Sequence, residues 1–464
     1  MSYAAHNLSD TIVALSTPPG SGAIGVIRLS GLDAIRIVDA VFHGKELQAQ
    51  ASHTIHFGTV RNEEGTILDE VLASLFVSPR SYTKENVVEV SCHGSSFIIQ
   101  QLLELFIRKG ARMAQPGEFT LRAFLNGQMD LSQAEAVADL IASSSASSHQ
   151  VAMQQMRGGF SNEIADLRQQ LIDFASLIEL ELDFGEEDVE FANRDDLKVL
   201  IYKIQKLLKT LIDSFRLGNV IKNGVNTVIA GRPNAGKSTL LNALLNEDRA
   251  IVSEIAGTTR DTIEEVLNIQ GVAFRLIDTA GIREAQDQIE AIGVEKTMEK
   301  IEQSALMVYV FDVIEMQPEE VQADLEKLVK DGVPFLAIAN KMDLNPYTKP
   351  EHYINDFLTE KQFIPVSAVN KMNIDYLKER LYDLVLDNKL SLESTIVTNS
   401  RHYDALNKAH TSLDDVLRGM DEGVTSDFVA MDIRQALHHL GTIVGEVSTD
   451  DLLGNIFSNF CIGK

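Results

Sequence analysis

One short stretch constrains the fold of this chain more than any other, the run GRPNAGKS at residues 231–238. It follows the apolar run Val225 to Ala230, which is typical of a buried strand, and it precedes Thr239 to Leu245, which is typical of a helix. Glycines in such a loop let backbone N–H groups turn toward phosphate oxygens, beside the positive end of the helix. The context predicts a phosphate-binding loop in a doubly wound α/β domain, with Lys237 on the β/γ phosphates and Ser238 on Mg²⁺.

Three downstream motifs, each after an expected strand, indicate a guanine nucleotide. DTAG at 278–281 can hold Mg²⁺ through water and sense a γ-phosphate. NKMD at 340–343 ends in an Asp whose carboxylate can accept hydrogen bonds from the guanine N1–H and 2-amino groups, which adenine does not offer. Ser367-Ala368 would place a backbone N–H on the guanine O6. In this order the motifs predict a GTPase.

The residue after DTAG shows how hydrolysis would differ from that in small GTPases. Those proteins have a Gln there that orients the attacking water, whereas this chain has Ile282, which is apolar. Glu290 is therefore a candidate general base, acting through a bridging water, although an ordinary charged residue of this region is an equal alternative.

The loop SEIAGTTRD at 253–261 occupies the first switch position, where Thr259 can bind Mg²⁺ with its hydroxyl. The side-chain carbonyl of Asn234, with backbone carbonyls from this loop, could hold a monovalent cation where an arginine finger would otherwise sit. Potassium suits such a cage because it makes no directional demands.

Composition limits what else the chain can be. At 464 residues it can form about three domains. The 41 basic and 67 acidic side chains give a formal charge of −26, which repels nucleic acid unless a basic patch or a partner protein intervenes. The two cysteines, Cys92 and Cys461, indicate a reducing compartment. Since no signal peptide or long apolar run is apparent, we expect a cytoplasmic protein with no membrane span.

Outside the nucleotide domain, the first 120 or so residues and the helical parts differ in their pattern of apolar residues. The first 120 or so residues alternate strand and helix patterns, with strands expected at 11–16, 23–29, 71–77 and 87–91 and helices at 32–42 and 97–107. In this part, Cys92-His93 is read as structural rather than as a zinc site. From Leu131 onward, apolar residues fall at helical spacing through 153–182 and 197–217, and this spacing resumes from Tyr403. The acidic run 186–190 is read as a loop rather than a metal site.

We therefore predict an α/β and α+β multidomain fold. The N-terminal α+β domain covers 1–124, the first part of a helical domain 125–220, the inserted GTPase domain 221–386, and the second helical part 387–464. The apolar C-terminal run ends in CIGK and either forms a docked helix or brings Cys461 and Lys464 into a reaction pocket.

Over its full length the chain resembles the tRNA-modification GTPases called MnmE or TrmE. The resemblance rests on TPPGSGAIGVIRLSG at 17–31, PGEFTLRAFLNGQMDLSQAEAVADLI at 116–141, the GTPase motifs including IAGTTRD at 255–261 and DTAGIRE at 278–284, and DDLLGNIFSNFCIGK at 450–464.

The resemblance implies a reaction and its partners. With the flavoprotein MnmG (GidA), in a heterotetramer, the family adds an aminomethyl or carboxymethylaminomethyl group to C5 of the wobble uridine of certain tRNAs. The one-carbon unit comes from 5-formyl- or methylene-tetrahydrofolate. The N-terminal domain is similar to folate-binding aminomethyltransferase domains and forms the main contact of a homodimer.

Family site residues carry over onto matching positions of this sequence. The folate contacts implied are Arg28, Glu89, Gln128 and Lys464, with Gln128 standing where many relatives have a basic residue. Mg²⁺ is held by Ser238 and Thr259, K⁺ by Asn234, Ser253, Ile255 and Thr258, and Glu290 is the hydrolytic base. The expected GTP contacts are Asn234, Ala235, Gly236, Lys237, Ser238, Thr239, Ser253, Glu254, Ile255, Ala256, Gly257, Thr258, Thr259, Asp278, Thr279, Ala280, Gly281, Asn340, Lys341, Met342, Asp343, Ser367, Ala368 and Val369.

Two other functions fit parts of the sequence. A ribosome-assembly or translational GTPase shares the nucleotide motifs, but such proteins usually append a basic RNA-binding module, which is not apparent here. A folate-dependent aminomethyltransferase with a regulatory GTPase would act on a small amine without RNA.

Overall fold

The computed structural model describes residues 10–183, 194–245, 264–278, 301, 304–329, 333–385, 395–458 and 460–463. The chain divides into two compact units, each described by itself below. The first contains residues 1–141, 154–205 and 408–464, and the second contains 142–153 and 206–407.

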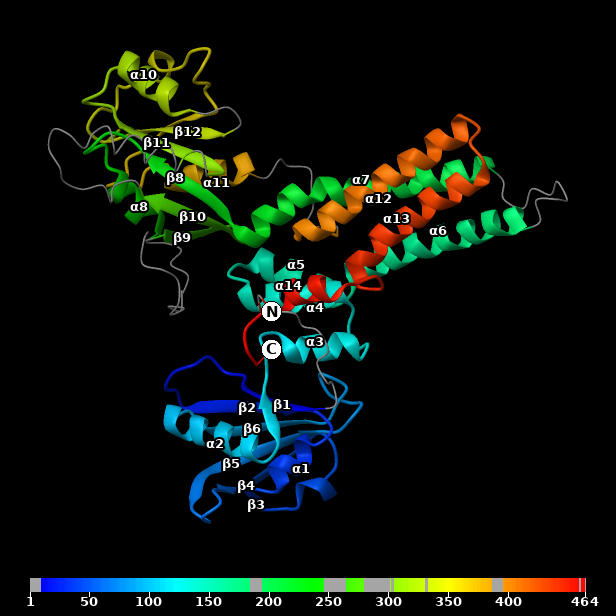
Figure 1. Ribbon diagram of the computed structural model, residues 1–464. Coiled ribbons are helices and arrows are strands. Elements are labelled where there is room, and N and C mark those ends of the chain that lie inside the picture. Colours follow the sequence, from blue (N-terminus) through cyan, green and yellow to red (C-terminus); the bar gives the residue numbers. More distant parts are fainter. Residues whose placement is uncertain are drawn as a thin grey trace. The chain divides into compact units, whose positions relative to one another are not determined.

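A seven-stranded sheet forms the N-terminal part of the first unit, with strand order β3-β4-β5-β6-β2-β1-β7 (Figure 1). Neighbouring strands are antiparallel except that β1 and β7 are parallel. The strands are β1 (Thr11–Leu15), β2 (Ile24–Ser30), β3 (Phe42–His43), β4 (Thr54–Arg61), β5 (Ile67–Phe76), β6 (Val87–His93) and β7 (Ala111–Met113).

Helices α1 (Ala34–Asp39) and α2 (Ser96–Arg108) pack on this sheet because each presents an apolar stripe to it. Their buried residues, such as Ile37 and Leu102, share one core with Val71 and Val90 of the sheet. The helix predicted over 32–42 is shorter than expected. The chain leaves it after Asp39, and Phe42 and His43 pair with β4 instead.

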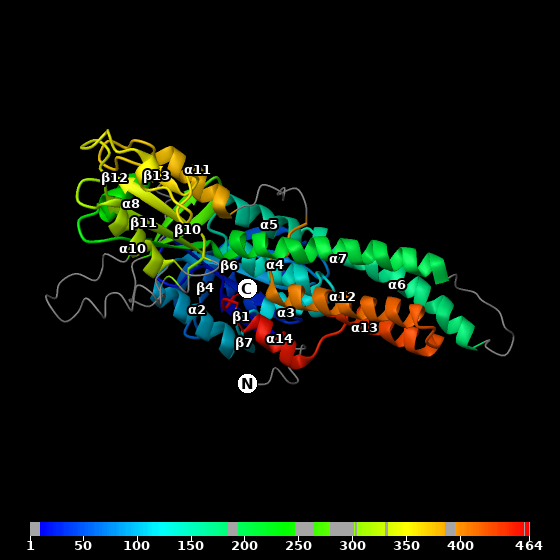
Figure 2. The same ribbon diagram turned by 90° about the horizontal axis from the view of Figure 1, so that it is seen from above.

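The remaining elements of the first unit are helical. Helices α6 (Gly159–Asp183) and α13 (Ser426–Val444) run side by side in both views (Figures 1 and 2). The helical run predicted over 153–182 is interrupted at Gly158, whose φ of +83° ends the preceding helix. The other helices are α3 (Glu118–Leu125), α4 (Leu131–Ala142), α7 (Arg194–Asn223), α12 (Ser400–Asp421) and α14 (Asp450–Phe457), with α7 and α12 continuing into the second unit.

The second unit is built on a six-stranded sheet of order β13-β12-β11-β8-β10-β9, in which only β9 is antiparallel to its neighbour. Helices α8 (Lys237–Leu245) and α11 (Ile374–Val385) share one core with the sheet, and α10 (Pro318–Leu328) shares another. The strands are β8 (Val225–Ala230), β9 (Glu264–Ile269), β10 (Val272–Asp278), β11 (Leu306–Asp312), β12 (Phe335–Asn340) and β13 (Phe363–Pro365). This is the doubly wound sheet that the strand-loop-helix motif predicts.

Helix α5 (Ala146–Met156) begins within the second unit. Its Val151 packs with Leu217 and Ile221 of α7 and with Ile396. The backbone N–H of Ser147 donates to the carbonyl of Gly271, in the turn between β9 and β10. Among the described residues, no helix is long and apolar enough to cross a membrane.

Candidate functional site

The phosphate loop follows the buried strand β8, and α8 begins at Lys237. Gly231 has a φ of +147°, and a Cβ there would lie 2.1 Å from the carbonyl oxygen of Val310 in β11. Any side chain would push the loop away from the neighbouring strand, so the glycine is required for this close approach.

Lys237 lies inside the loop rather than extending from it. Its Nζ donates to the carbonyl oxygens of Gly231, at 2.7 Å, and Arg232, at 2.9 Å. Asn234 is exposed with a φ of +63°, and Ser238 and Thr239 are exposed in the first turn of α8. The loop thus brings a cation, a side-chain amide and two hydroxyls to the N-terminus of a helix, which is an anion-binding arrangement.

Asn340, at the end of β12, connects the phosphate loop to the Ser367 loop. Its side chain is 2% exposed, donates to the Ala235 carbonyl at 2.9 Å, and accepts from the Ala368 N–H at 3.1 Å. A Cβ on Gly236, whose φ is +89°, would lie 2.3 Å from Nδ2 of Asn340. Asn340 therefore connects the phosphate loop to the loop that carries Ala368.

The side chains expected to read the base are ordered by their neighbours. Ser367 is buried and its Oγ donates to Oδ1 of Asp343 at 2.6 Å. Lys341, with a φ of +67°, is paired to Asp312 at 2.5 Å. The Met342 N–H donates to the Val366 carbonyl, and the Val369 side chain is 74% exposed. The Asp343 carboxylate is thus oriented by the hydroxyl of Ser367.

Several predicted residues lie outside the described part of the chain. These are Ser253, Glu254, Ile255, Ala256, Gly257, Thr258, Thr259, Thr279, Ala280, Gly281, Glu290 and Lys464. Asp278 ends β10, where its backbone lies opposite Ile229 of β8 in the parallel register.

A set of ion pairs that holds the phosphate loop to α10 was not predicted from the sequence. Arg232 donates from Nε and Nη2 to the two oxygens of Asp324, at 2.8 and 3.1 Å, and from Nη1 to Glu320 at 2.9 Å. The buried Tyr309 donates its hydroxyl to Asp324 at 2.7 Å. Burial pushes the pKa of Asp324 up, but the hydrogen bonds from Arg232 and Tyr309 outweigh it, and that pKa lies below its usual value.

A second polar site lies on the N-terminal sheet. Arg28 of β2 and Glu89 of β6 face each other in the antiparallel register, and the guanidinium reaches Oε1 of Glu89 from Nε at 2.9 Å and from Nη2 at 2.7 Å. The same guanidinium lies over the rings of Tyr82 and Phe119, 5.6 and 5.7 Å from their centroids. Arg28 is therefore fixed by both charge and aromatic contacts.

The C-terminal tail reaches this second site. Leu453, Phe457 and Phe460 are buried against α3 and α4, so α14 is docked. Beyond it, the carbonyl of Gly463 accepts from Oγ of Ser16 at 3.3 Å and from Nη1 of Arg28 at 3.5 Å. The docked helix is thus confirmed, and it brings the Gly463 carbonyl to Arg28. The reading that places Cys461 and Lys464 in a reaction pocket stays a prediction, because Lys464 lies outside the described residues.

Gln128 lines a cleft of about 530 Å³ that lies beside the Arg28 site. Tyr82 lines this cleft and also contacts Arg28, so the ring is shared by the two places. The structure thus brings Arg28, Glu89 and the tail together directly, and relates Gln128 to them through Tyr82.

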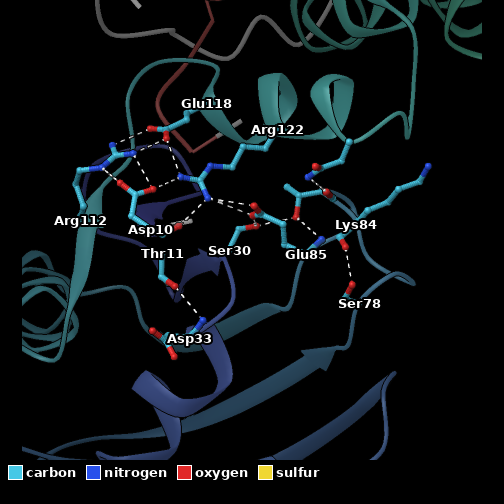
Figure 3. A network of polar contacts seen from close by, with 12 residues as sticks. Asp10, Thr11, Ser30, Asp33, Ser78, Lys84, Glu85, Arg112, Glu118 and Arg122 are labelled. Carbon is cyan, nitrogen blue, oxygen red and sulfur yellow. Dashed lines mark hydrogen bonds and ion pairs between the residues drawn. The ribbon is translucent and has the colours of Figure 1, made fainter. Parts of the chain in front are cut away.

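A buried ion network supports this domain (Figure 3). Arg122 of α3 has no exposed surface and contacts Asp10 at 2.6 Å, Glu118 at 3.1 Å and Glu85 at 3.2 Å. Arg112 contacts Asp10 and Glu118 as well, at 2.7 and 2.6 Å. Burial raises the pKa of Glu118, but hydrogen bonds from Arg112 and the Gln115 N–H and the charge of Arg122 outweigh it, so that pKa lies below its usual value.

Cys92 and His93 have separate surroundings. Cys92 is buried, its thiol donates to the Gly25 carbonyl at 3.4 Å, and burial raises its pKa to about 11. Nδ1 of His93 lies 2.7 Å from Oδ1 of Asp69. Among the described residues, no group of three or more potential metal-binding side chains comes together.

Comparison with known proteins relates both sites to one family. The family model for the MnmE helical domain matches residues 131–461, and the one for the GTP-binding protein TrmE N-terminus matches 11–128. The chain is 57% identical over 458 residues to a protein of Cytophaga hutchinsonii named tRNA modification GTPase MnmE, covering 99% of this chain and 98% of the relative. This chain belongs to the MnmE family of tRNA modification GTPases.

Further MnmE relatives match at similar length. Those of Christiangramia forsetii and Flavobacterium psychrophilum are 56% and 55% identical, cover 98% of this chain in both cases, and are themselves covered to 100% and 99%. These matches, together with the six-stranded sheet of the second unit, confirm the family and the fold class predicted from the motifs: a TrmE N-terminal domain, a helical domain and a P-loop GTPase domain.

Proposed function

We propose that this chain hydrolyses GTP and, with a flavoprotein of the MnmG type, modifies C5 of the wobble uridine in certain tRNAs. The group added is aminomethyl or carboxymethylaminomethyl, and its one-carbon unit comes from 5-formyl- or methylene-tetrahydrofolate. Relatives that match nearly the whole chain carry the name tRNA modification GTPase MnmE, which supports this assignment.

The arrangement around Asp343 is the observation that carries the choice of nucleotide. A carboxylate held by Ser367 at 2.6 Å can accept from both the N1–H and the 2-amino group of guanine. Adenine offers neither donor, so it would cover this exposed carboxylate without replacing the hydrogen bonds that water makes to it. Asn340, Lys341 and Ala368 keep the surrounding loop in place.

The phosphate side fits a triphosphate with Mg²⁺ and K⁺. Ser238 and Thr259 would supply hydroxyl oxygens to Mg²⁺, which prefers oxygen ligands. Asn234, with Ser253, Ile255 and Thr258, would supply oxygens to K⁺. These ions neutralise charge that develops on the transferred phosphoryl group. Lys237 stabilises the β/γ phosphates, and Glu290 takes the proton of the attacking water through a bridging water.

The N-terminal site fits a reduced folate. Both contacts from Arg28 reach Oε1 of Glu89, so Oε2 is not used by this pair. A carboxylate in that state can accept from the amino-pyrimidine edge of a pterin. Lys464 follows Gly463, whose carbonyl already contacts Arg28, and Gln128 lines the adjoining cleft. We assign all four residues to folate binding.

We also propose an oligomeric state and domain boundaries for this chain. The chain would act in the cytoplasm as a homodimer through its N-terminal domains and as a heterotetramer with the flavoprotein, which supplies RNA-binding charge that an acidic chain lacks. We propose domain boundaries at 1–124, 125–220, 221–386 and 387–464.

A reconstitution tests this function. The full chain, an MnmG flavoprotein, unmodified tRNA, GTP, a reduced folate and ammonium or glycine as the amine donor are combined, and the wobble nucleoside is identified by mass spectrometry. We expect C5 modification in K⁺, and in Na⁺ a sharp fall in GTP turnover with little change in GTP affinity. Lys237→Ala is the matched control that removes phosphate stabilisation.

The alternatives give different results in the same experiment. A ribosome-assembly GTPase would hydrolyse GTP and leave the uridine unchanged. An aminomethyltransferase would consume the folate when a small amine is supplied, with no change in the RNA. An unmodified wobble uridine with active flavoprotein present would rule out the proposed reaction.

A further inference from the structure

The cleft beside the Arg28 site has walls of two kinds. Phe76 and Tyr82 provide aromatic rings, while Arg80, Gln128 and His53 provide polar groups around a volume of about 530 Å³. The edge of the His53 ring contacts Phe76, with centroids 5.4 Å apart and ring planes at 84°. Such a mixture suits a ligand that is aromatic in part and anionic in part.

The ring of Tyr82 lies between the cleft and the Arg28 guanidinium. Its ring lines the cleft and carries the Arg28 guanidinium at 5.6 Å. Its hydroxyl is bonded to Oγ1 of Thr120 at 2.8 Å, so the ring has a fixed orientation. Tyr82 therefore borders both the Arg28 site and the cleft.

Arg80 lines this cleft, and its positive charge is available to bind an anionic ligand. It is exposed, and among the described residues no carboxylate lies within ion-pair distance of it. The turn that carries it is ordered, because the Arg80 N–H donates to the Val77 carbonyl and the Ser81 hydroxyl donates to the Glu85 carbonyl. Lys84 adds a second cation nearby, with its ammonium 2.6 Å from the carbonyl of Gly127, the residue before Gln128.

Reduced folates have the matching chemistry. A pterin is joined to an aminobenzoyl ring and then to glutamate, which carries two carboxylates at neutral pH. A chain with a net charge of −26 repels such a tail unless local cations compensate. The cleft offers rings for the aminobenzoyl group and cations for the carboxylates.

We propose that this cleft binds the aminobenzoyl-glutamate tail of the folate, with Phe76 and Tyr82 contacting the ring and Arg80 binding the carboxylates. In this arrangement Arg80 supplies the positive charge that Gln128 does not. The inference rests on the proposed use of a reduced folate and assigns the part of that ligand that the Arg28 site leaves unaccounted for.

Calorimetry with two ligands on the full chain tests the assignment. One ligand is 5-formyltetrahydrofolate, and the other is 6-methyltetrahydropterin, which lacks the tail. We expect Arg80→Gln to weaken the tailed ligand about tenfold, the effect of one charge-assisted hydrogen bond, and to leave the tail-less pterin unchanged. Arg36→Gln is the matched control, because Arg36 is an exposed arginine of the same domain that pairs with Asp33 away from the cleft.

A second variant, designed to tighten binding, keeps the test informative if Arg80→Gln fails to fold. Gln128→Lys adds a cation to the cleft and should tighten the tailed ligand severalfold without affecting the pterin. Equal loss of both ligands in Arg80→Gln, or no response of the tailed ligand to either variant, would refute the tail site while leaving folate binding in place. A parent chain that binds neither ligand would instead remove the folate proposal, and the tail site with it.

Discussion

The nucleotide site and the Arg28 site are built in opposite ways. The phosphate loop is made from consecutive residues, 231–238, between one strand and one helix. The Arg28 site joins segments that are far apart in the chain, since Ser16, Arg28, Tyr82, Glu89 and Gly463 all contribute. A local site depends on backbone conformation at a few positions, whereas a distributed site depends on the stability of the domain that brings its segments together.

The largest effect should therefore come from breaking the network that supports the distributed site. Arg122→Met removes a fully buried cation and leaves Asp10, Glu85 and Glu118 without its charge. We expect the N-terminal domain to lose about 3–5 kcal/mol of unfolding free energy. Calorimetry should show its melting temperature lower by roughly 10 °C or more. Folate affinity should fall with it, while GTP affinity at the local site stays within twofold.

Acidification gives this prediction a second readout. The pKa values of Asp10 and Glu118 lie below their ordinary values of 3.8 and 4.5, so both groups stabilise the folded state at neutral pH. That contribution disappears as the pH falls through the lowered pKa values. The deficit of Arg122→Met relative to the parent should be constant near neutral pH and should shrink as the pH falls below the ordinary carboxyl values of 3.8 and 4.5, because the parent then loses the contribution of its ion pairs. A deficit independent of pH would contradict the electrostatic account, and Arg36→Met should change stability by less than about 0.5 kcal/mol.

The second effect tests the local site. Gly236→Ala places a Cβ 2.3 Å from Nδ2 of Asn340 at a φ of +89°. The conformational penalty and the displaced Asn340 hydrogen bonds together cost about 3 kcal/mol, so GTP affinity should fall on the order of 100-fold. Fluorescent nucleotide titration measures the loss. The melting of the N-terminal domain and the folate affinity should stay at parental values.

Gly419→Ala is the matched control for this glycine. The nearest atom to a Cβ there is 3.7 Å away, so the substitution is accommodated in α12. If both variants bound GTP like the parent, the phosphate loop would be adaptable rather than dependent on its backbone, and the contrast between the two sites would disappear.

The difference in construction also explains what the sequence could predict. The strand expected over 225–230 is β8, residue for residue, because a continuous apolar run and a following glycine are local signals. The predictions did not include β11, although its residues are all buried and its apolar run carried the signal. They also lacked β7, whose three residues form a strand only by pairing with β1, about a hundred positions away.

The same limit applies to individual side chains. Arg28 and Glu89 could be related only through family resemblance, because nothing in their spacing indicates that β2 and β6 are neighbours. Tyr82 and Gly463 were not connected to Arg28 by any pattern, since an aromatic contact and a tail carbonyl have no sequence signature. Asn340 was expected among the GTP contacts, but the partner of its buried amide, the Ala235 carbonyl, could not be named from the sequence, because the two residues are 105 positions apart.

The smallest effect should come from the ion pair of Arg232 with Asp324, which connects the phosphate loop to α10. Because the Arg232 side chain is 43% exposed, its ion pair contributes little free energy, about 0.2–1 kcal/mol. The carbonyls of Gly231 and Arg232 hold Lys237, however, so a loosened loop should lower GTP turnover up to about fivefold with little change in KM.

Asp324→Asn and Arg232→Gln should have the same effect if Arg232 positions the loop. If the guanidinium instead contacts phosphate during hydrolysis, Asp324→Asn frees it, and turnover would be maintained or increased while Arg232→Gln alone is impaired. Arg380→Gln, which removes the ion pair with Asp383 within α11 of the same unit, should leave turnover unchanged.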